Sequence, residues 1–324
     1  MTNFQVYKKT LSFSLLSFLV DLIVLAIIAG LATAGFFLFN ESNDMAIVGL
    51  VIGLVVGIII AALISFFISN RIKAAQIAMM TKGVTEDNLP DHVFHQGFVE
   101  LRGRFAKITL FFVVTNAIKG IFRQIGRGIT NVGQAVGGNV GGSIGSAVDS
   151  AIQTLLSYLT DCCLGWVLFR KDENSAKAAC EGAVIFFKHG KTLIRNVGRI
   201  FGMGFVSLLL IGGAFFGVSY LIFSQYPAMF TMLTNEISEA VARGDVENFP
   251  AFLLQPNTFM IFTSAIGGLV VWGIIHNVLI RPFILTGVLR NFMEAGKEHI
   301  PTEADFKELD SKYPKFAKLR SKNI

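Results

Sequence analysis

The sequence predicts an all-α, polytopic membrane protein with about six spanning helices, arranged as two parallel two-helix repeats flanking a glycine-zipper hairpin. Three observations lead to this fold class: long apolar segments, an alternating distribution of basic residues, and a similarity between the two ends of the chain. Of the 324 residues, 53% are hydrophobic and 15% are charged, and the mean hydropathy is +0.61. Soluble domains carry about 25% charged residues, so the composition argues against a soluble fold.

Several segments are apolar over the length of about 20 residues that a bilayer crossing requires. They are 11–39, 45–69, 200–223 and 259–280. A soluble helix buries only one face, and these segments are apolar on every face. Asp21 is the one charged residue in the first of them.

Lysine and arginine are unevenly distributed between the connecting segments. The loop 40–44 has none and 225–257 has one, whereas basic residues gather in the remaining segments, 1–10, 70–107, 170–199 and 281–324. The positive-inside rule then places both termini in the cytoplasm of a multi-pass protein of the inner or plasma membrane. The net charge of +6 is explained by this topology and by anionic lipid at the cytoplasmic face, and nucleic acid is not an expected partner.

The two ends of the chain resemble each other, which indicates an internal duplication. Lys9-Thr10-Leu11 matches Lys191-Thr192-Leu193, and at the same offset Gly30 and Gly35 match Gly212 and Gly217. The second helices also match, as GLVVGIIIAALI against GLVVWGIIHNVLI. We therefore divide the chain into a first repeat, 1–107, a central hairpin, 108–174, and a second repeat with a basic tail, 175–324.

The central segment contains glycine at every fourth position. Gly133, Gly137, Gly141 and Gly145 would form one face of a helix, and such a face lets two helix backbones approach closely in lipid. The partner helix is either 151–169 of the same chain or a second copy, which would make an oligomer. A flexible glycine-rich linker is the alternative, and the segment either spans the membrane or re-enters it.

Polar residues inside apolar helices are costly and commonly mark a ligand or a polar pathway. The candidates are Asp21, the stripe Lys119, Arg123 and Arg127, Asp161, which could neutralise one of that stripe, and the group His276, Asn277 and Arg281. Buried hydrogen bonding between helices is the alternative for His276 and Asn277. The amphipathic segment 175–191 is expected to lie along the inner leaflet.

Sequence signatures of catalysis are absent: there is no HExxH, GxSxG or phosphate-binding loop. His92 and His95 are three residues apart, but two ligands without a third predict a solvated segment and no metal site. The cysteines, Cys162, Cys163 and Cys180, have no metal-binding spacing and are expected to be reduced and structural. We expect neither an enzyme nor a cofactor.

Two functions are consistent with these features. The first is an integral membrane protein that binds or passes a small solute or lipid, in the manner of a transporter or channel. The alternative is a non-catalytic scaffold or complex subunit that oligomerises through the glycine zipper. Costly buried polar groups favour the first.

Overall fold

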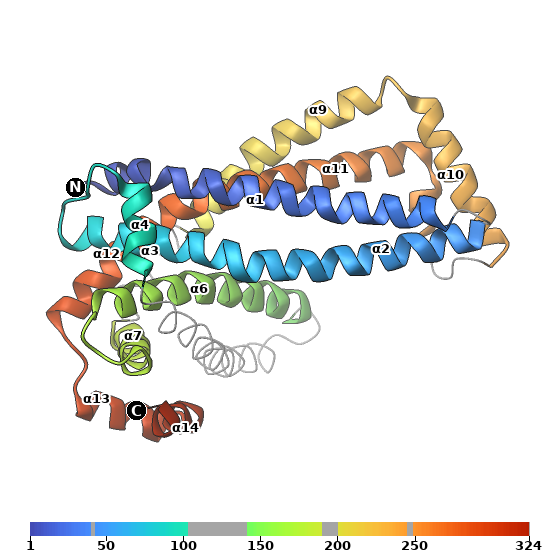
Figure 1. Cartoon of the computed structure of the whole chain (residues 1–324). Coiled ribbons are helices and arrows are strands. Elements are labelled where there is room, and N and C mark those ends of the chain that lie inside the picture. Colours follow the sequence, from blue (N-terminus) through green and yellow to red (C-terminus); the bar gives the residue numbers. More distant parts are fainter. Residues whose placement is uncertain (40–42, 103–140, 190–199, 245–248, 324) are drawn as a thin grey trace. The chain divides into compact units, whose positions relative to one another are not determined.

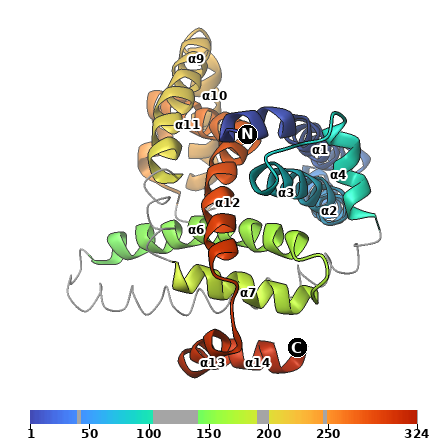
Figure 2. The same cartoon turned by 90° about the vertical axis from the view of Figure 1, so that its left-hand side faces the viewer.

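The computed structural model describes residues 1–39, 43–102, 141–189, 200–244 and 249–323 (Figures 1 and 2). All regular structure in these ranges is helical, as the sequence predicts. The chain forms two compact units: Met1–Val197 with Pro282–Ile324, and Gly198–Arg281. These two units are defined by which residues pack together. The division of the sequence into 1–107, 108–174 and 175–324 is instead based on internal duplication, and it stays a prediction.

A long antiparallel hairpin dominates the first unit. Helix α1 (Asn3–Leu38) and helix α2 (Asn43–Ile64) lie side by side in both views. Helix α2 continues through a five-residue π-helical turn, η1 (Ser65–Ser69), into helix α3 (Asn70–Thr85). The N-terminus of α1 is capped because Thr2 and Gln5 exchange hydrogen bonds between side chain and backbone.

The hairpin is held together by a glycine stripe on α2. Gly49, Gly53 and Gly57 recur every four residues and therefore share one helix face. A Cβ atom on Gly49 would collide with the backbone oxygen of Gly35, one on Gly53 with that of Leu31, and one on Gly57 would lie 3.0 Å from the Ile28 Cα. Glycine is required here because the two backbones touch.

The surface of α1 and α2 changes sharply along their length. Exposed large apolar side chains run from Leu15 to Leu38 on α1 and from Met45 to Ile68 on α2 and η1. Each stretch is about 36 Å long at 1.5 Å per residue, slightly more than the roughly 30 Å of a hydrocarbon core. We call this surface the apolar band, and the end of the hairpin beyond Leu15 and Ile68 the body end.

Beyond the band, the same helices enter a conventionally packed helical body. Its elements besides α3 are α4 (Val93–Leu101), α6 (Gly141–Phe169), α7 (Ser175–Lys188), α12 (Arg281–Glu298), α13 (Glu303–Lys312) and α14 (Pro314–Asn323). At Asn70 the mainly apolar sequence gives way to one in which polar residues are interspersed with apolar ones, and α3 is buried from Ala74 to Thr81. Glycine again allows close packing, since a Cβ on Gly296 of α12 would lie 2.5 Å from the Trp166 ring of α6.

Helix α7 corrects the expectation that 175–191 lies on the membrane surface. Its apolar residues Ala178, Ala179, Val184 and Ile185 are buried inside the body. The buried carboxylate of Glu181 accepts hydrogen bonds from Trp166 Nε1 at 2.9 Å and from Arg170 Nε at 3.2 Å, both on or just after α6. The amphipathic pattern of α7 therefore serves the protein core. Amphipathicity alone does not distinguish a protein core from a bilayer as the apolar partner.

The cysteines lie in this body as free, buried thiols, and Cys162 and Cys163 are on α6. Burial raises the pKa of the Cys180 thiol on α7 to about 12. This thiol is therefore protonated at neutral pH, as expected of a structural cysteine.

The second unit contains the other long hairpin. Its first helix spans Ile200–Phe223 and includes the π-helical turn η3 (Leu208–Gly212) and helix α9 (Gly213–Phe223). Helix α10 (Pro227–Ala242) and the short 3-10 helix η4 (Ala251–Leu254) lead to α11 (Pro256–Ile275) and the π-helical turn η5 (His276–Ile280). A Cβ on Gly268 of α11 would lie 2.7 Å from the Gly212 oxygen, so close backbone contact recurs here.

Four helices in the described part of the chain are long and apolar enough to cross a membrane: Asn3–Leu38, Val48–Thr85, Ile200–Phe223 and Pro256–Glu298. The sequence predicts about six, with the additional pair in the central segment. There the apolar stretch Ser157–Phe169 of α6 is too short to span, and its side chains from Tyr158 to Leu168, apart from Thr160, are buried in the body. Most of the central segment, 103–140, lies outside the described residues.

The glycine stripe of α2 gives the first prediction. Replacing Gly53 with leucine is expected to force α1 and α2 apart and to destabilise the hairpin by about 2–3 kcal/mol or more, the usual cost of overpacking. Gly30→Leu is the matched control, because a Cβ there meets no described atom within 4 Å. Thermal unfolding in nanodiscs measures both variants, and equal melting temperatures would contradict the close contact.

Asp305 gives a pH-dependent prediction. Burial raises the pKa of this carboxyl, but hydrogen bonds from Lys188, from the backbone and side chain of Thr302 and from His299 outweigh burial and hold the pKa well below its usual value. A depressed pKa stabilises the fold above the unfolded value of about 4, and this contribution is lost as the pH falls through that value and below it.

Between pH 6 and pH 3, the melting temperature of the wild type should therefore fall more than that of Asp305→Asn. Differential scanning fluorimetry in detergent measures both slopes. Parallel slopes would show that Asp305 does not link α7 to α13 in this way.

Candidate functional site

The depth of Asp21 follows from the register of the α1–α2 hairpin. Gly57 lies against Ile28, and seven residues further along each helix Asp21 is level with Ile64, where α2 ends. Asp21 is exposed and lies only six residues from Leu15, where the apolar band begins. It is therefore placed toward the body end of the hairpin, away from the middle of the apolar segment.

His276 and Asn277 lie in the π-helical turn η5, and Arg281 begins α12. His276 is half-buried beside the Trp272 ring at 5.2 Å, and Trp272 Nε1 donates a hydrogen bond to the Ser207 hydroxyl at 3.0 Å. Asn277 is exposed. Because α11 before them has 20 residues, about the length of one crossing, these polar residues also follow the end of an apolar span.

Asp161 on α6 is 2% exposed and forms an ion pair with Lys73 of α3, with 2.6 Å between Nζ and Oδ1. Lys119, Arg123 and Arg127, the partners that the sequence suggested, lie outside the described residues, so that pairing stays a prediction. Lys73 was missed because its helix and α6 are far apart in sequence. Only the packing of α3 on α6 places Lys73 beside Asp161.

The glycine ladder is described only in part. Gly133 and Gly137 lie outside the described residues, whereas Gly141 begins α6 and Gly145 lies in its second turn. The stripe at Gly49, Gly53 and Gly57 was overlooked, although its spacing in the sequence is the same. That spacing is the signal that could have identified the α1–α2 contact.

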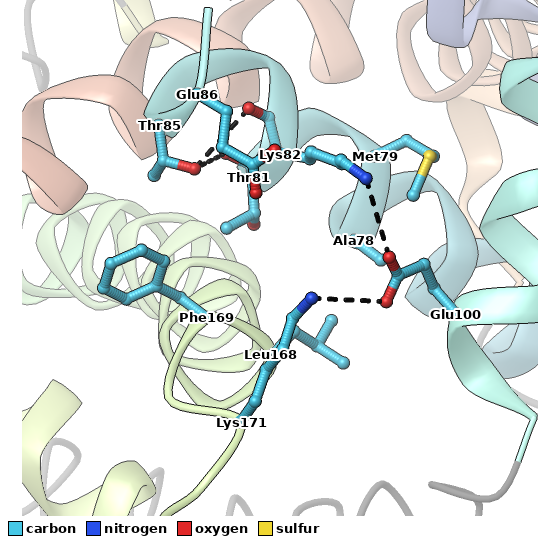
Figure 3. A pocket seen from close by; sticks show the side chains of 10 residues that line it. All are labelled: Ala78, Met79, Thr81, Lys82, Thr85, Glu86, Glu100, Leu168, Phe169 and Lys171. Atoms are coloured by element: carbon cyan, nitrogen blue, oxygen red, sulfur yellow. Dashed lines mark hydrogen bonds and ion pairs between the residues drawn. The ribbon is translucent and has the colours of Figure 1, made fainter. Parts of the chain in front are cut away.

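A small cavity opens in the body between α3, α4 and the end of α6 (Figure 3). Lys82 and Lys171 point toward the Glu100 carboxylate from two sides, each at 3.7 Å. The cavity volume of about 30 Å³ corresponds to one water molecule. Because Glu100 partly neutralises both lysines, this group fits a cross-link between the helices better than a ligand site.

A much larger, open cavity of about 740 Å³ lies between α1 and α4, and we call it the boundary cavity. Its lining residues are Lys9, Ser12, Asp91, His92, Val93, Phe94 and His95. Helix α4 is positioned by aromatic contacts, since the Phe13 ring of α1 lies 5.1 Å from that of Phe94 and 5.9 Å from that of Phe98. Gly97 permits this approach, because a Cβ there would lie 2.6 Å from the Phe13 ring.

The boundary cavity includes His92 and His95, which the sequence analysis assigned to a solvated segment. Both are exposed, as that prediction requires. No group of three or more histidine, cysteine, aspartate or glutamate side chains that could hold a metal ion occurs among the described residues. Asp21, Asp161 and His276 do not line this cavity.

The Lys73–Asp161 pair gives a prediction about stability. Lys73→Met removes the cation that pairs with the buried Asp161 carboxylate and should lower the free energy of unfolding by about 2–3 kcal/mol, below the 3–5 kcal/mol of a fully buried pair because Lys73 is one-third exposed.

In a double-mutant cycle, Lys73→Met combined with Asp161→Asn should cost less than the sum of the single changes. Lys82→Met is the control, because its longer contact with Glu100 is expected to contribute about 1 kcal/mol or less. Chemical unfolding in detergent provides the free energies. Strict additivity would exclude a coupled pair.

Comparison of the chain with models of protein families, with curated proteins and with solved structures returns no match. Inference about its function therefore rests on its own residues and contacts.

Proposed function

We propose that the chain is a non-enzymatic, integral membrane protein that binds a lipid where its first hairpin leaves the membrane. Four helices suited to crossing a bilayer support the membrane location. The distribution of lysine and arginine supports a cytoplasmic position for the helical body and both termini. The two hairpins, each with a π-helical turn in its second long helix, fit the duplication proposed from the sequence.

The first hairpin favours binding of a lipid over passage of a solute, because most of its apolar length lacks polar side chains. Helix α2 has no polar side chain from Met45 to Ile64, and α1 has only Thr33 between Leu22 and Leu38. A polar pathway through a bilayer requires polar groups at mid-membrane depth. This hairpin offers them only toward the body end, at Asp21 and beyond.

The main support for lipid binding is the boundary cavity between α1 and α4. It is open, polar on several sides and bordered by the exposed ring of Phe94. Lys9 lies six residues before Leu15, about 9 Å along α1 from the start of the apolar band. That distance corresponds to the headgroup layer, so a lipid there could keep its acyl chains against α1.

A scaffold is the second candidate, and one observation favours it. Gly213 and Gly217, four residues apart on α9, have no described atom within 4 Å of a Cβ built on them. Small residues of this kind on a spanning helix can pack against a helix of another chain. The glycine ladder at 133–145 would act in the same way.

Native mass spectrometry of the protein released from nanodiscs tests both candidates, because it reports the number of chains and of retained lipids. The lipid-binding proposal predicts a retained lipid that saturates at one per chain for this cavity. An oligomer without retained lipid, which Gly213→Leu combined with Gly217→Leu converts to monomers, would instead support the scaffold. The variant Gly137→Leu combined with Gly141→Leu tests the ladder in the same experiment.

A further inference from the structure

The boundary cavity contains one fixed positive and one fixed negative charge. Lys9 comes from α1, just before the apolar band, and Asp91 comes from the residues that precede α4. Neither side chain makes a hydrogen bond or an ion pair with any other described residue. The Lys9 ammonium and the Asp91 carboxylate lie more than 4.0 Å apart, so the cavity that they share has space between the two charges.

Several hydrogen-bond donors accompany Lys9 in the cavity. Ser12 provides a hydroxyl group, and His92 and His95 provide imidazoles that likewise make no hydrogen bond with any other described residue. The first turn of α4 has no side-chain cap, so its free N–H groups and the positive end of its dipole add to the attraction for an anion. A phosphate group could accept hydrogen bonds from Lys9 and these donors. The carboxylate of Asp91 would pair best with a positively charged hydrogen-bond donor of the ligand.

These features identify the class of lipid. The two fixed charges, on Lys9 and Asp91, cancel, which matches a zwitterionic headgroup better than an anionic one. Phosphatidylethanolamine carries a phosphate and, two methylene groups away, a primary ammonium with three N–H donors. A phosphatidylglycerol headgroup has no cation for Asp91, and the quaternary ammonium of phosphatidylcholine has no N–H to donate.

We propose that the boundary cavity binds the headgroup of an aminophospholipid, phosphatidylethanolamine, with the phosphate at Lys9 and the ammonium at Asp91. The acyl chains then follow the exposed apolar side chains of α1, beginning at Leu15 and Leu19. This inference rests on the proposed function and specifies its ligand. It also gives a role to His92 and His95 as donors to the phosphate, in place of metal binding.

The test uses the full-length protein in nanodiscs of phosphatidylcholine that contain 10% phosphatidylethanolamine or 10% phosphatidylglycerol (about one lipid in ten, so that every headgroup is in excess over the chain). Native mass spectrometry measures which lipid remains bound. For the wild type we expect about a tenfold preference for phosphatidylethanolamine over phosphatidylcholine, the gain of one charge-assisted hydrogen bond, so that phosphatidylethanolamine makes up about half of the retained lipid.

The variants separate the two halves of the site. Asp91→Asn should abolish the preference for phosphatidylethanolamine over phosphatidylcholine while leaving phospholipid bound, and Lys9→Gln should weaken retention of every phospholipid about tenfold. Lys8→Gln is the matched control, because it removes the same charge from the adjacent exposed residue, which does not line the cavity. All three side chains are exposed, so the variants should keep the wild-type melting temperature.

Three results would overturn the inference. Equal effects of Lys8→Gln and Lys9→Gln would show general attraction to the membrane surface. Enrichment of phosphatidylglycerol would identify an anionic lipid as the ligand, in which case lipid binding as the proposed function would still stand. Failure of the wild type to retain any lipid stoichiometrically would remove both the inference and the proposed function.

Discussion

The backbone contact between α1 and α2 is the constraint on which the rest of the first unit depends. Gly49, Gly53 and Gly57 bring the two helices together so closely that the register of the hairpin has no freedom. In a bilayer, where apolar side chains gain little by leaving lipid for protein, such backbone proximity is a main source of helix association. The register then determines which residues of the two helices lie at the same level, from the contact of Gly35 with Gly49 to Asp21 and Ile64.

At the body end of this hairpin, one continuous helix passes from the apolar band into the packed core of the body. Through η1, α2 continues into α3 without a break, and burial rises as the sequence becomes polar and small. A single rigid element therefore joins the apolar band to the body. Lys73 on α3 neutralises the buried Asp161 of α6, and Trp166 and Arg170 satisfy the buried Glu181, so the body tolerates internal carboxylates.

The boundary cavity is a consequence of the same geometry. Helix α4 is held on α1 by Phe13 and its aromatic neighbours, close to the level at which the apolar band begins. In the membrane position proposed above, this level coincides with the layer of lipid headgroups. Lys9, Asp91 and the two histidines would then face phosphate and ammonium groups, and the proposed binding requires only that the cavity distinguish among them.

The sequence by itself determined the helical class and the four apolar helices, because hydrophobicity over about 20 residues depends on composition and not on contacts. It also contained the spacing of Gly49, Gly53 and Gly57, a local periodicity that was available and overlooked. The tertiary structure alone decided the pairing of Asp161 with Lys73, the burial of α7 and of most of 158–168 in the body, and the placement of Lys9 and Asp91 in one cavity. Each of these features depends on contacts between segments that are far apart in the chain. The periodicity of a sequence shows which face of a helix is apolar, but it does not show whether protein or lipid packs against that face.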